Sequence, residues 1–310
     1  MTRGRRRAVW VWSIFLAAGA GFAGSGAAPD STGVTIRMAA SSSLVGAEVN
    51  ENDARAAIRT WADTLSRETG LHLTYLREVL VPPQELFEYV RQGQVDAFSA
   101  TIAEYLQVAG YTDPGIVLVD QAYVNGGEEY LLLVHEDSGI RSVGELRGHS
   151  LAQYNGSVMS LAPEWLATLL AESNLGAPAS FFNQITLNGK ISRTVLLVFF
   201  RQYDACLVTR RTFDTMKEMN PQLGKKLRVL ATSPKLVPIV VALRKNSSAL
   251  AKEKFSSAMT RLGDGPAGRQ LLSLFGSRRV MVASASILGP SIELVTAGNR
   301  LKARGAPAKR

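Results

Sequence analysis

The alternation of apolar and polar positions predicts a chain built from short strands and helices in turn. An apolar run at 34–40 predicts a strand, and the apolar residues from Ala54 to Leu65 then fall on one helical face. Asn52 or Asp53 is the expected N-cap of this helix. The first pair of elements is therefore a strand followed by a long helix.

The same rhythm continues to about residue 121. It predicts, in order, a strand at 71–79, a helix at 82–93, a strand at 95–100, a helix at 101–110 and a strand at 115–121. Because each crossover helix packs back onto the sheet, a run of such units predicts a mostly parallel sheet covered by helices.

A second set of strands and helices spans about 127–232, and an apolar strand at 238–245 follows it. Two crossings, near 125–128 and 232–238, would divide the chain into lobe 1 (33–126 and 234–295) and lobe 2 (127–233). The predicted fold class is therefore α/β, with two lobes and a ligand cleft between them. Ligands of open α/β sheets bind beyond the carboxyl ends of strands, and pockets are common between lobes.

The net charge of +9 is located at the two ends of the chain. Four arginines and no acid lie within residues 1–28, and five basic residues and no acid lie within 297–310. The body between them is formally neutral, whereas nucleic-acid binding needs a basic surface on the fold itself. We therefore expect no nucleic-acid partner, and we expect 297–310 to be a disordered basic tail.

The N-terminal residues have the order of a secretory signal peptide. The basic MTRGRRR precedes an apolar run of 15 residues and a stretch of small residues that includes Ala27. The alternative is a retained anchor, but a membrane span needs about 20 apolar residues. We expect residues 1–28 to be a signal peptide, cleaved near Ala27, and the mature protein to be periplasmic.

Metal and nucleophile chemistry have little support in the sequence. Cys206 is the only cysteine and lies in an apolar run, so a buried, inert thiol is expected. His72, His135 and His149 are dispersed, without a zinc-binding spacing, and no nucleophile-elbow, P-loop or dinucleotide motif occurs. We therefore expect no cofactor, no metal and no catalytic residue.

The stretch NGSVMS at 155–160 places flexible backbone and two hydroxyls ahead of a helix predicted at about 158–173. Free N–H groups and the peptide dipoles make a helix start favourable for an anion. Gly156 would allow a close approach, and Ser157 and Ser160 would donate hydrogen bonds. The alternative is that Asn155, Ser157 or Ser160 only caps the helix. The residues alone leave both interpretations open.

Several blocks carry a resemblance to a known family. They are TIRMAA at 35–40, RQGQVDAFSATIAEYL at 91–106, GIRSVGELRGHSLA at 139–152, the loop before the helix, and YDACLVTRRTFDTM at 203–216. In this order and spacing the chain resembles, from about 34 to 276, the extracytoplasmic solute-binding proteins of phosphonate, phosphite and phosphate ABC transporters. The resemblance implies a type II-like periplasmic-binding-protein fold whose two lobes close on a ligand.

The chain differs from the family's usual motifs at several positions. Of the family's Gly-Pro-x-x-Tyr, the stretch Thr101–Tyr105 keeps only the tyrosine, and of the family's Ser-Thr-Ser-Gly loop Ser157 keeps a hydroxyl. The resemblance and the predicted strand ends together give these ligand-binding residues: Ser41, Ser42, Ser99, Thr101, Tyr105, Gly156, Ser157, Ser160, Lys190 and Asp204.

Some of these residues have an ordinary structural alternative. Ser41 and Ser42 face the ligand or only turn the chain, and Tyr105 binds the ligand or packs in the core. Lys190 stands near a helix start, where a cation opposes the dipole unless an anion is bound. Asp204 binds a ligand amine or caps its strand.

The resemblance implies a binding protein and not an enzyme. It would capture a small oxyanion, such as a phosphonate, phosphite or phosphate, as a monomer and present it to a membrane ABC permease. Closure would follow from the ligand bridging both lobes only in the closed state. The alternative is a periplasmic sensing protein that signals to a membrane sensor kinase or cyclase.

Overall fold

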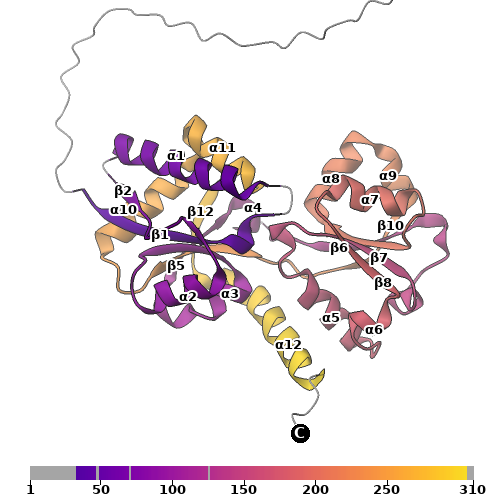
Figure 1. Cartoon of the computed structure of the whole chain (residues 1–310). Coiled ribbons are helices and arrows are strands. Elements are labelled where there is room, and N and C mark those ends of the chain that lie inside the picture. Colours follow the sequence, from indigo (N-terminus) through magenta and orange to yellow (C-terminus); the bar gives the residue numbers. More distant parts are fainter. Residues whose placement is uncertain (1–32, 47–48, 70, 125, 306–310) are drawn as a thin grey trace, which may run out of the picture. The chain divides into compact units, whose positions relative to one another are not determined.

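The computed structural model describes residues 33–46, 49–69, 71–124 and 126–305, and Figure 1 shows them as two α/β lobes. Each lobe has its own sheet, one of seven strands and one of five, with helices packed on both faces. The predicted α/β class is thus confirmed. The expected signal peptide lies outside the described residues.

The sheet of lobe 1 is mixed. Its strands are β1 (Thr35–Ser41), β2 (His72–Thr74), β3 (Leu80–Val81), β4 (Ala97–Thr101), β5 (Thr112–Asp120), β11 (Ile239–Arg244) and β12 (Val280–Ala283), in the order β12-β5-β11-β4-β1-β2 with β3 also on β1. Strand β1 is parallel to β4, whereas β11 is antiparallel to both β4 and β5. The carboxyl ends of β1, β4 and β5 therefore share one edge of the sheet.

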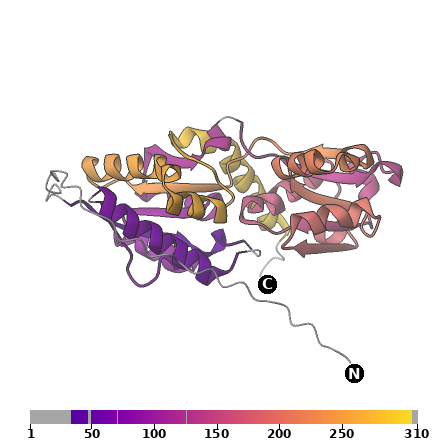
Figure 2. The same cartoon turned by 90° about the horizontal axis from the view of Figure 1, so that it is seen from above.

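Two groups of helices cover this sheet, one on each face (Figure 1), and Figure 2 looks down onto one of the two groups. The helices α1 (Glu51–Thr69), α10 (Ala249–Thr260) and α11 (Pro266–Leu274) pack on one face, and α2 (Pro83–Arg91) and α3 (Ile102–Leu106) pack on the other. The short helix α4 (Gln121–Val124) follows β5. The N-cap of α1 is corrected to Asn50, whose side-chain oxygen accepts a hydrogen bond from the Asn52 N–H at 2.8 Å.

Lobe 2 repeats the plan on a smaller scale. Its strands are β6 (Tyr130–His135), β7 (Ser150–Tyr154), β8 (Gln184–Asn188), β9 (Ala205–Thr209) and β10 (Leu227–Thr232), in the order β10-β6-β9-β7-β8. The helices α5 (Ala162–Glu172) and α6 (Pro178–Phe181) pack on one face, and α7 (Ile191–Phe199), α8 (Arg210–Met219) and α9 (Pro221–Lys226) pack on the other. Strand β7 is parallel to both β8 and β9, so the carboxyl ends of these three strands also share one edge.

The two chain crossings between the sheets pair with each other. The N–H of Glu128 donates to the carbonyl of Leu236 at 2.7 Å, and the N–H of Leu236 donates back to Glu128 at 2.9 Å. These hydrogen bonds lie between β5 and β6 on one crossing and between β10 and β11 on the other. The connection between the sheets is therefore a short antiparallel bridge of two extended segments.

The C-terminal residues correct one prediction. The expected disordered tail at 297–310 is helical as far as Gly305, within α12 (Gly289–Gly305), and 306–310 lie outside the described residues. The helix packs on α5 and also contacts α3. Gly298 allows the close crossing, because a Cβ there would lie 2.8 Å from Cγ of Glu164. The ammonium of Lys302 also lies 2.8 Å from a carboxylate oxygen of Glu164, so partners in lobe 2 hold this basic segment.

Candidate binding site

The loop after β7 stands at the carboxyl edge of the lobe 2 sheet. The N–H of Asn155 donates to the carbonyl of Asn188 at 2.8 Å, which joins this loop to the end of β8. Gly156 follows, then a single 3₁₀ turn at Ser157–Met159, and then α5. The structure therefore places Gly156, Ser157 and Ser160 together in one loop at the edge where ligands of such sheets bind.

The hydroxyls of this loop do not cap the helices that follow it. In the described part of the chain, neither the 3₁₀ turn nor α5 receives a capping hydrogen bond from a side chain. The Ser160 hydroxyl donates instead to the carbonyl of Pro238 at 3.2 Å, across to the segment that enters β11. The Ser157 hydroxyl is half-buried and has no hydrogen-bond partner among the described residues. Local capping therefore does not account for these serines.

A loop of lobe 1 reaches the same place from the other side. After β1 the chain makes a 3₁₀ turn at Ser42–Leu44 and continues to Gly46. A Cβ built on Gly46 would lie 3.6 Å from the Ser157 nitrogen and 3.7 Å from Cα of Gly156. The half-buried Ser42 belongs to this turn. The two loops are thus so close that a Cβ at Gly46 would reach van der Waals contact with the Gly156–Ser157 backbone.

A carboxylate that the sequence analysis missed occupies the lobe 1 edge. Ser41 is fully buried, and its hydroxyl donates to one oxygen of Glu104 at 2.9 Å. The other oxygen of Glu104 accepts from the Thr101 N–H at 2.9 Å, and the Thr101 hydroxyl accepts from the Glu104 N–H at 3.4 Å. This is a capping box, and the spacing Thr-x-x-Glu is its sequence signature. Ser41 and Thr101 lie where they were expected, but both already bind this carboxylate.

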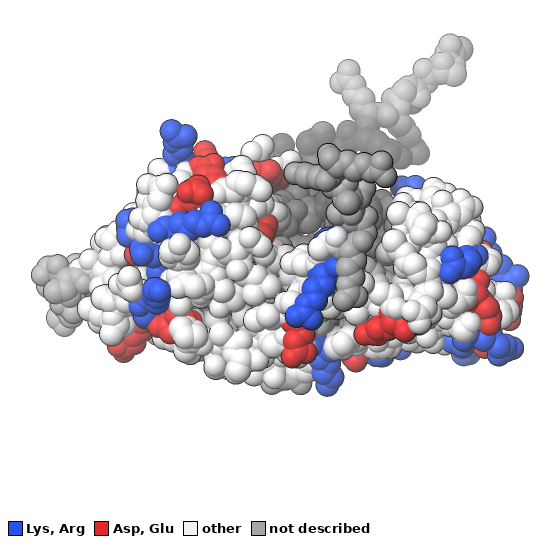
Figure 3. All heavy atoms as spheres, turned by 90° about the horizontal axis from the view of Figure 1, so that it is seen from below, with Lys and Arg blue, Asp and Glu red and all other residues white. Residues whose placement is uncertain are grey.

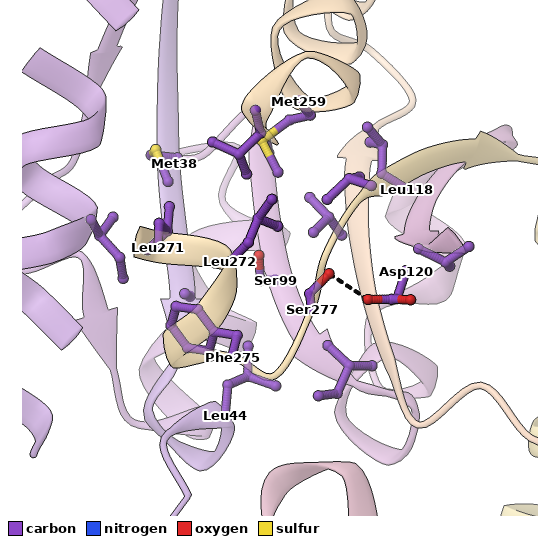
Figure 4. Close-up of a pocket in the computed structure, with 18 of the residues that line it drawn as sticks. Met38, Leu44, Ser99, Leu118, Asp120, Met259, Leu271, Leu272, Phe275 and Ser277 are labelled. Atoms are coloured by element: carbon purple, nitrogen blue, oxygen red, sulfur yellow. Dashed lines mark hydrogen bonds between the residues drawn. The ribbon is translucent and has the colours of Figure 1, made fainter. Parts of the chain in front are cut away.

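Two other predicted residues of lobe 1 point elsewhere. The Tyr105 ring is buried, and its hydroxyl lies 3.2 Å from that of Thr112 at the amino end of β5, so this tyrosine packs and does not face the edge. Ser99 faces a cavity between the sheet and the helices α10 and α11, as Figure 4 shows. The strand alternation of β4 explains this, because Ser99 and Ala97 share the face that α10 and α11 cover. Both residues are therefore removed from the candidate site.

Lys190 follows β8, the strand next to the one that leads into the loop Gly156–Ser160, here called the serine loop. It is the N-cap of α7, directly after β8, and its side chain is exposed. Since β7 and β8 are parallel and the Asn155 N–H binds the carbonyl of Asn188, the lysine and the loop belong to neighbouring strand ends. A cation at this helix start is unfavourable without an anion nearby, so this position is consistent with the predicted role of the lysine.

Asp204 is a further correction, because it lies at the opposite edge of the lobe 2 sheet. It precedes β9, and one of its oxygens accepts from the N–H and the hydroxyl of Ser150, at 2.8 and 2.7 Å, where β7 begins. Burial raises the pKa of Asp204, but these hydrogen bonds and His149 outweigh it, so the pKa lies below its usual value. The aspartate ties two strand starts together and does not face the serine loop.

Two acids at the start of lobe 2 are paired with arginines that the sequence analysis did not single out. An oxygen of the buried Glu128 lies 3.3 Å from the Arg211 guanidinium, and Glu129 binds Arg210. Burial raises the pKa of Glu128, and Arg211 opposes that rise. Because the two arginines begin α8 and the two acids follow the chain crossing, these ion pairs join α8 to the crossing.

The described residues offer little support for other chemistry. They contain no group of three or more His, Cys, Asp or Glu that is placed to hold a metal ion. Cys206 is fully buried in β9, and burial raises the pKa of its thiol, which keeps it protonated and unreactive. Within the described ranges no helix combines the length and the apolar character that a membrane span requires. On the face seen in Figure 3, basic and acidic side chains are interspersed.

The comparison with protein families is decisive for identification. The family of periplasmic substrate-binding proteins of phosphonate ABC transporters matches residues 47–287, which is most of the chain. The chain belongs to this family. The resemblance stated from the sequence blocks is thus confirmed.

Solved structures share the fold. A binding protein component of an ABC phosphonate transporter from Pseudomonas aeruginosa has 14% identity, a TM-score of 0.56, and coverage of 89% of this chain and 90% of its own. The PhnD1 protein of Prochlorococcus marinus in complex with methylphosphonate has 15% identity, a TM-score of 0.56, and coverage of 86% and 98%. The protein XAC2383 of Xanthomonas citri bound to ATP has 18% identity, a TM-score of 0.60, and coverage of 88% and 99%. No curated protein sequence matches the chain.

Membership of this family indicates the general role of the chain. Its members are periplasmic substrate-binding components of ABC transporters, so the chain is a substrate-binding protein of that transport class. The identities to the solved structures are low, and those likenesses establish the periplasmic-binding fold alone.

Proposed function

We propose that this chain captures a small phosphorus oxyanion, of the phosphonate, phosphite or phosphate class, and presents it to an ABC permease. The oxyanion would bind the serine loop Gly156–Ser160, with Lys190 beside it and the Ser42–Gly46 turn covering it. The observation that carries this proposal is the Ser157 hydroxyl, which caps no helix and has no partner among the described residues. It stands at the carboxyl edge of parallel strands, and the exposed Lys190 follows the neighbouring strand β8.

The chemistry of this loop suits an oxyanion. Free backbone N–H groups at the start of a helix, a serine hydroxyl and an ammonium group are all donors, and each hydrogen bond to a charged partner contributes about 1.5–3 kcal/mol. Two structural neighbours are bound to methylphosphonate and to ATP, and both of these ligands carry phosphorus oxyanions. They support the class of ligand and do not identify the solute.

The contact between the two loops supports a closing mechanism. A Cβ added to Gly46 would reach the backbone of Gly156 and Ser157, so a ligand held by the serine loop would also be covered from lobe 1. Binding would then favour the closed state, because only that state gives the ligand both sets of contacts. The protein would act as a monomer, without cofactor and without catalysis.

A ligand screen by thermal unfolding tests the proposal. Phosphate, phosphite, methylphosphonate, sulfate and small carboxylates are added separately to the purified chain. We expect at least one phosphorus oxyanion to stabilise it, because a ligand at 100 times its Kd adds about 2.7 kcal/mol to the free energy of unfolding. If every oxyanion leaves the midpoint unchanged, the proposal is wrong.

Ser157→Ala then tests the loop, with Ser173→Ala as a matched control at the far end of α5. Ser157→Ala should weaken the oxyanion found in the screen by about tenfold to a hundredfold, as expected for one lost hydrogen bond to a charged group. It should lower the stability of the ligand-free protein only slightly. The control should change neither quantity. Equal affinity in both variants would remove Ser157 from the site.

We also propose that residues 1–28 form a signal peptide that is removed on export. This rests on the order of basic, apolar and small residues, which is typical of such peptides, and on the periplasmic character of the family. Mass spectrometry of protein from the periplasm of an expressing bacterium should find the new N-terminus within two residues of Ala28. An intact N-terminus on the exported protein would contradict this expectation.

A further inference from the structure

An apolar cavity lies inside lobe 1, between the sheet and the helices α1, α10 and α11. Its volume is about 140 Å³. Figure 4 shows Met38, Leu118 and Met259 around it, together with Leu272 and Phe275 of the segment that leads to β12. The cavity is on the face of the sheet that the hydrophobic core of α1, α10 and α11 covers, and none of its lining residues belongs to lobe 2.

Small side chains on two neighbouring strands create this space. Ala40 of β1 pairs with Ser99 of β4, and Met38 pairs with Ala97. Three of these four positions are therefore alanine or serine, side by side on one face of the sheet. A core normally fills such positions, because protein interiors pack like crystals and leave few voids. The cavity therefore results from the small side chains of these two strands.

Two methionines line the cavity from different sides, Met38 on the sheet and Met259 on α10. Met38 and Met259 keep 9% and 8% of their surface exposed, whereas Leu118 of the same cavity is fully buried. Methionine is unbranched and polarizable, so it adapts to groups of different shape. The cavity wall thus combines small side chains on the sheet with two adaptable methionines.

Polar groups line one side of the cavity. The Ser277 hydroxyl donates to a carboxylate oxygen of Asp120, and the other oxygen of Asp120 accepts from the Ala122 N–H at 2.7 Å. Ser99, which Figure 4 also labels, lines the cavity as well. Among the described residues the Ser99 hydroxyl has no hydrogen-bond partner. An apolar pocket with a few convergent polar groups is the usual form of a small-molecule site.

We propose that this cavity is a second binding site, separate from the serine loop, for a small neutral molecule of the phenol type. Such a molecule has one ring and a single hydroxyl. The size fits, because an apolar cavity of about 150 Å³ holds one benzene molecule. The ligand hydroxyl pairs with the Ser99 hydroxyl, and the ring contacts Met38, Met259 and Leu272. This site does not depend on the proposed oxyanion function.

Methionine methyl NMR of the full chain, with phenol as the probe, tests the proposal. In a titration with phenol to about 10 mM, the methyl signals of Met38 and Met259 should shift and reach saturation. The signals of Met216 and Met219, on α8 of lobe 2, should not move. No saturable shift at Met38 and Met259 would overturn the proposal, and so would equal shifts at all four methionines.

Variants that fill the cavity give an independent result. Ala97→Leu should weaken phenol binding at least tenfold while the unfolding midpoint stays equal or rises, because the added atoms occupy empty space. Ala40→Val adds less volume on the neighbouring strand and serves if Ala97→Leu fails to fold. A filled variant that binds phenol as tightly as the parent would contradict the proposed location.

The polar contact is tested by comparing phenol with toluene. Ser99→Ala should weaken phenol about fivefold to tenfold and leave toluene unchanged, whereas an equal loss for both would contradict the proposed pairing. Ser157→Ala should leave phenol binding unchanged. Because Ser157→Ala affects only the oxyanion and Ala97→Leu only phenol, the failure of one proposal remains distinguishable from the failure of the other.

Discussion

The carboxyl edges of the two sheets carry similar hydroxyl-rich loops but use their donors differently. On lobe 1, Ser41 and the Thr101 N–H already bind the carboxylate of Glu104. On lobe 2, the Ser157 hydroxyl has no partner among the described residues, and the exposed Lys190 follows the neighbouring strand. One edge is thus satisfied from within, and the other offers donors to a ligand.

This difference indicates how the two lobes divide the work of binding. A fixed carboxylate repels an anion by an amount that decreases with distance and with the effective dielectric constant. Glu104 therefore disfavours an oxyanion directly against the ends of β1 and β4, while the serine loop of lobe 2 favours one. Lobe 2 would hold the charge of the ligand, and lobe 1 would supply cover through the Ser42–Gly46 turn.

The largest expected effect of breaking this asymmetry is on stability. Ser41→Ala removes a buried hydroxyl that donates to a carboxylate, so the free energy of unfolding should fall by about 2 kcal/mol. The oxyanion affinity should change less than threefold, because the Ser41 hydroxyl already donates its hydrogen bond to Glu104. Urea unfolding and calorimetric titration measure the two quantities.

Ser43→Ala is the matched control, since Ser43 lies two residues away and its side chain is exposed. It should leave both quantities close to those of the parent. If Ser41→Ala instead abolishes oxyanion binding and hardly alters stability, the buried serine is a ligand residue and the proposed division between the lobes is wrong.

A smaller effect is expected from removing the charge of Glu104 while keeping its shape. Glu104→Gln should strengthen oxyanion binding about tenfold, which equals 1.4 kcal/mol, because the repulsion disappears. The amide oxygen can still accept from the Thr101 N–H, and the amide NH2 can donate to the Ser41 hydroxyl. Glu253→Gln is the control, since this exposed residue lies on α10, which follows the opposite end of β11. Weaker binding in Glu104→Gln would mean that the carboxylate helps the ligand, for instance by accepting a hydrogen bond from it.

The regular elements of the fold followed well from the sequence. Apolar periodicity placed the long helix α1, whose buried residues Ala54, Ile58 and Trp61 face the sheet. Apolar periodicity did not predict the C-terminal helix α12. This helix contains Gly298 and a cluster of basic residues, which are typical of a solvated tail. The helix is held by its partners: the glycine lets it approach α5, and Lys302 binds Glu164. Such tertiary support has no local sequence signal.

The candidate site was only partly predictable, for a related reason. Strand ends and loops placed Gly156, Ser157 and Ser160 together, as expected. Which way a side chain faces, however, depends on register, and register turned Ser99 into the cavity of lobe 1. Glu104 was missed although its capping box is visible in the sequence, because only the fold brings it to Ser41, 63 positions away in the chain.

The smallest effect on stability is expected at Asp204. This residue tests whether the amino edge of the lobe 2 sheet, unlike the carboxyl edge, takes no part in ligand binding. The pKa of Asp204 lies below its usual value of 3.8, so its charged form is favoured by folding. Its contribution is therefore complete above pH 3.8 and is lost as the pH falls below that value. Asp204→Asn should lose stability at neutral pH and show a shallower decline in acid, measured by urea unfolding at several pH values. Because Asp204 binds Ser150 at the amino edge, oxyanion affinity at neutral pH should remain that of the parent. An unchanged acid profile combined with weaker oxyanion binding would return this aspartate to the ligand site.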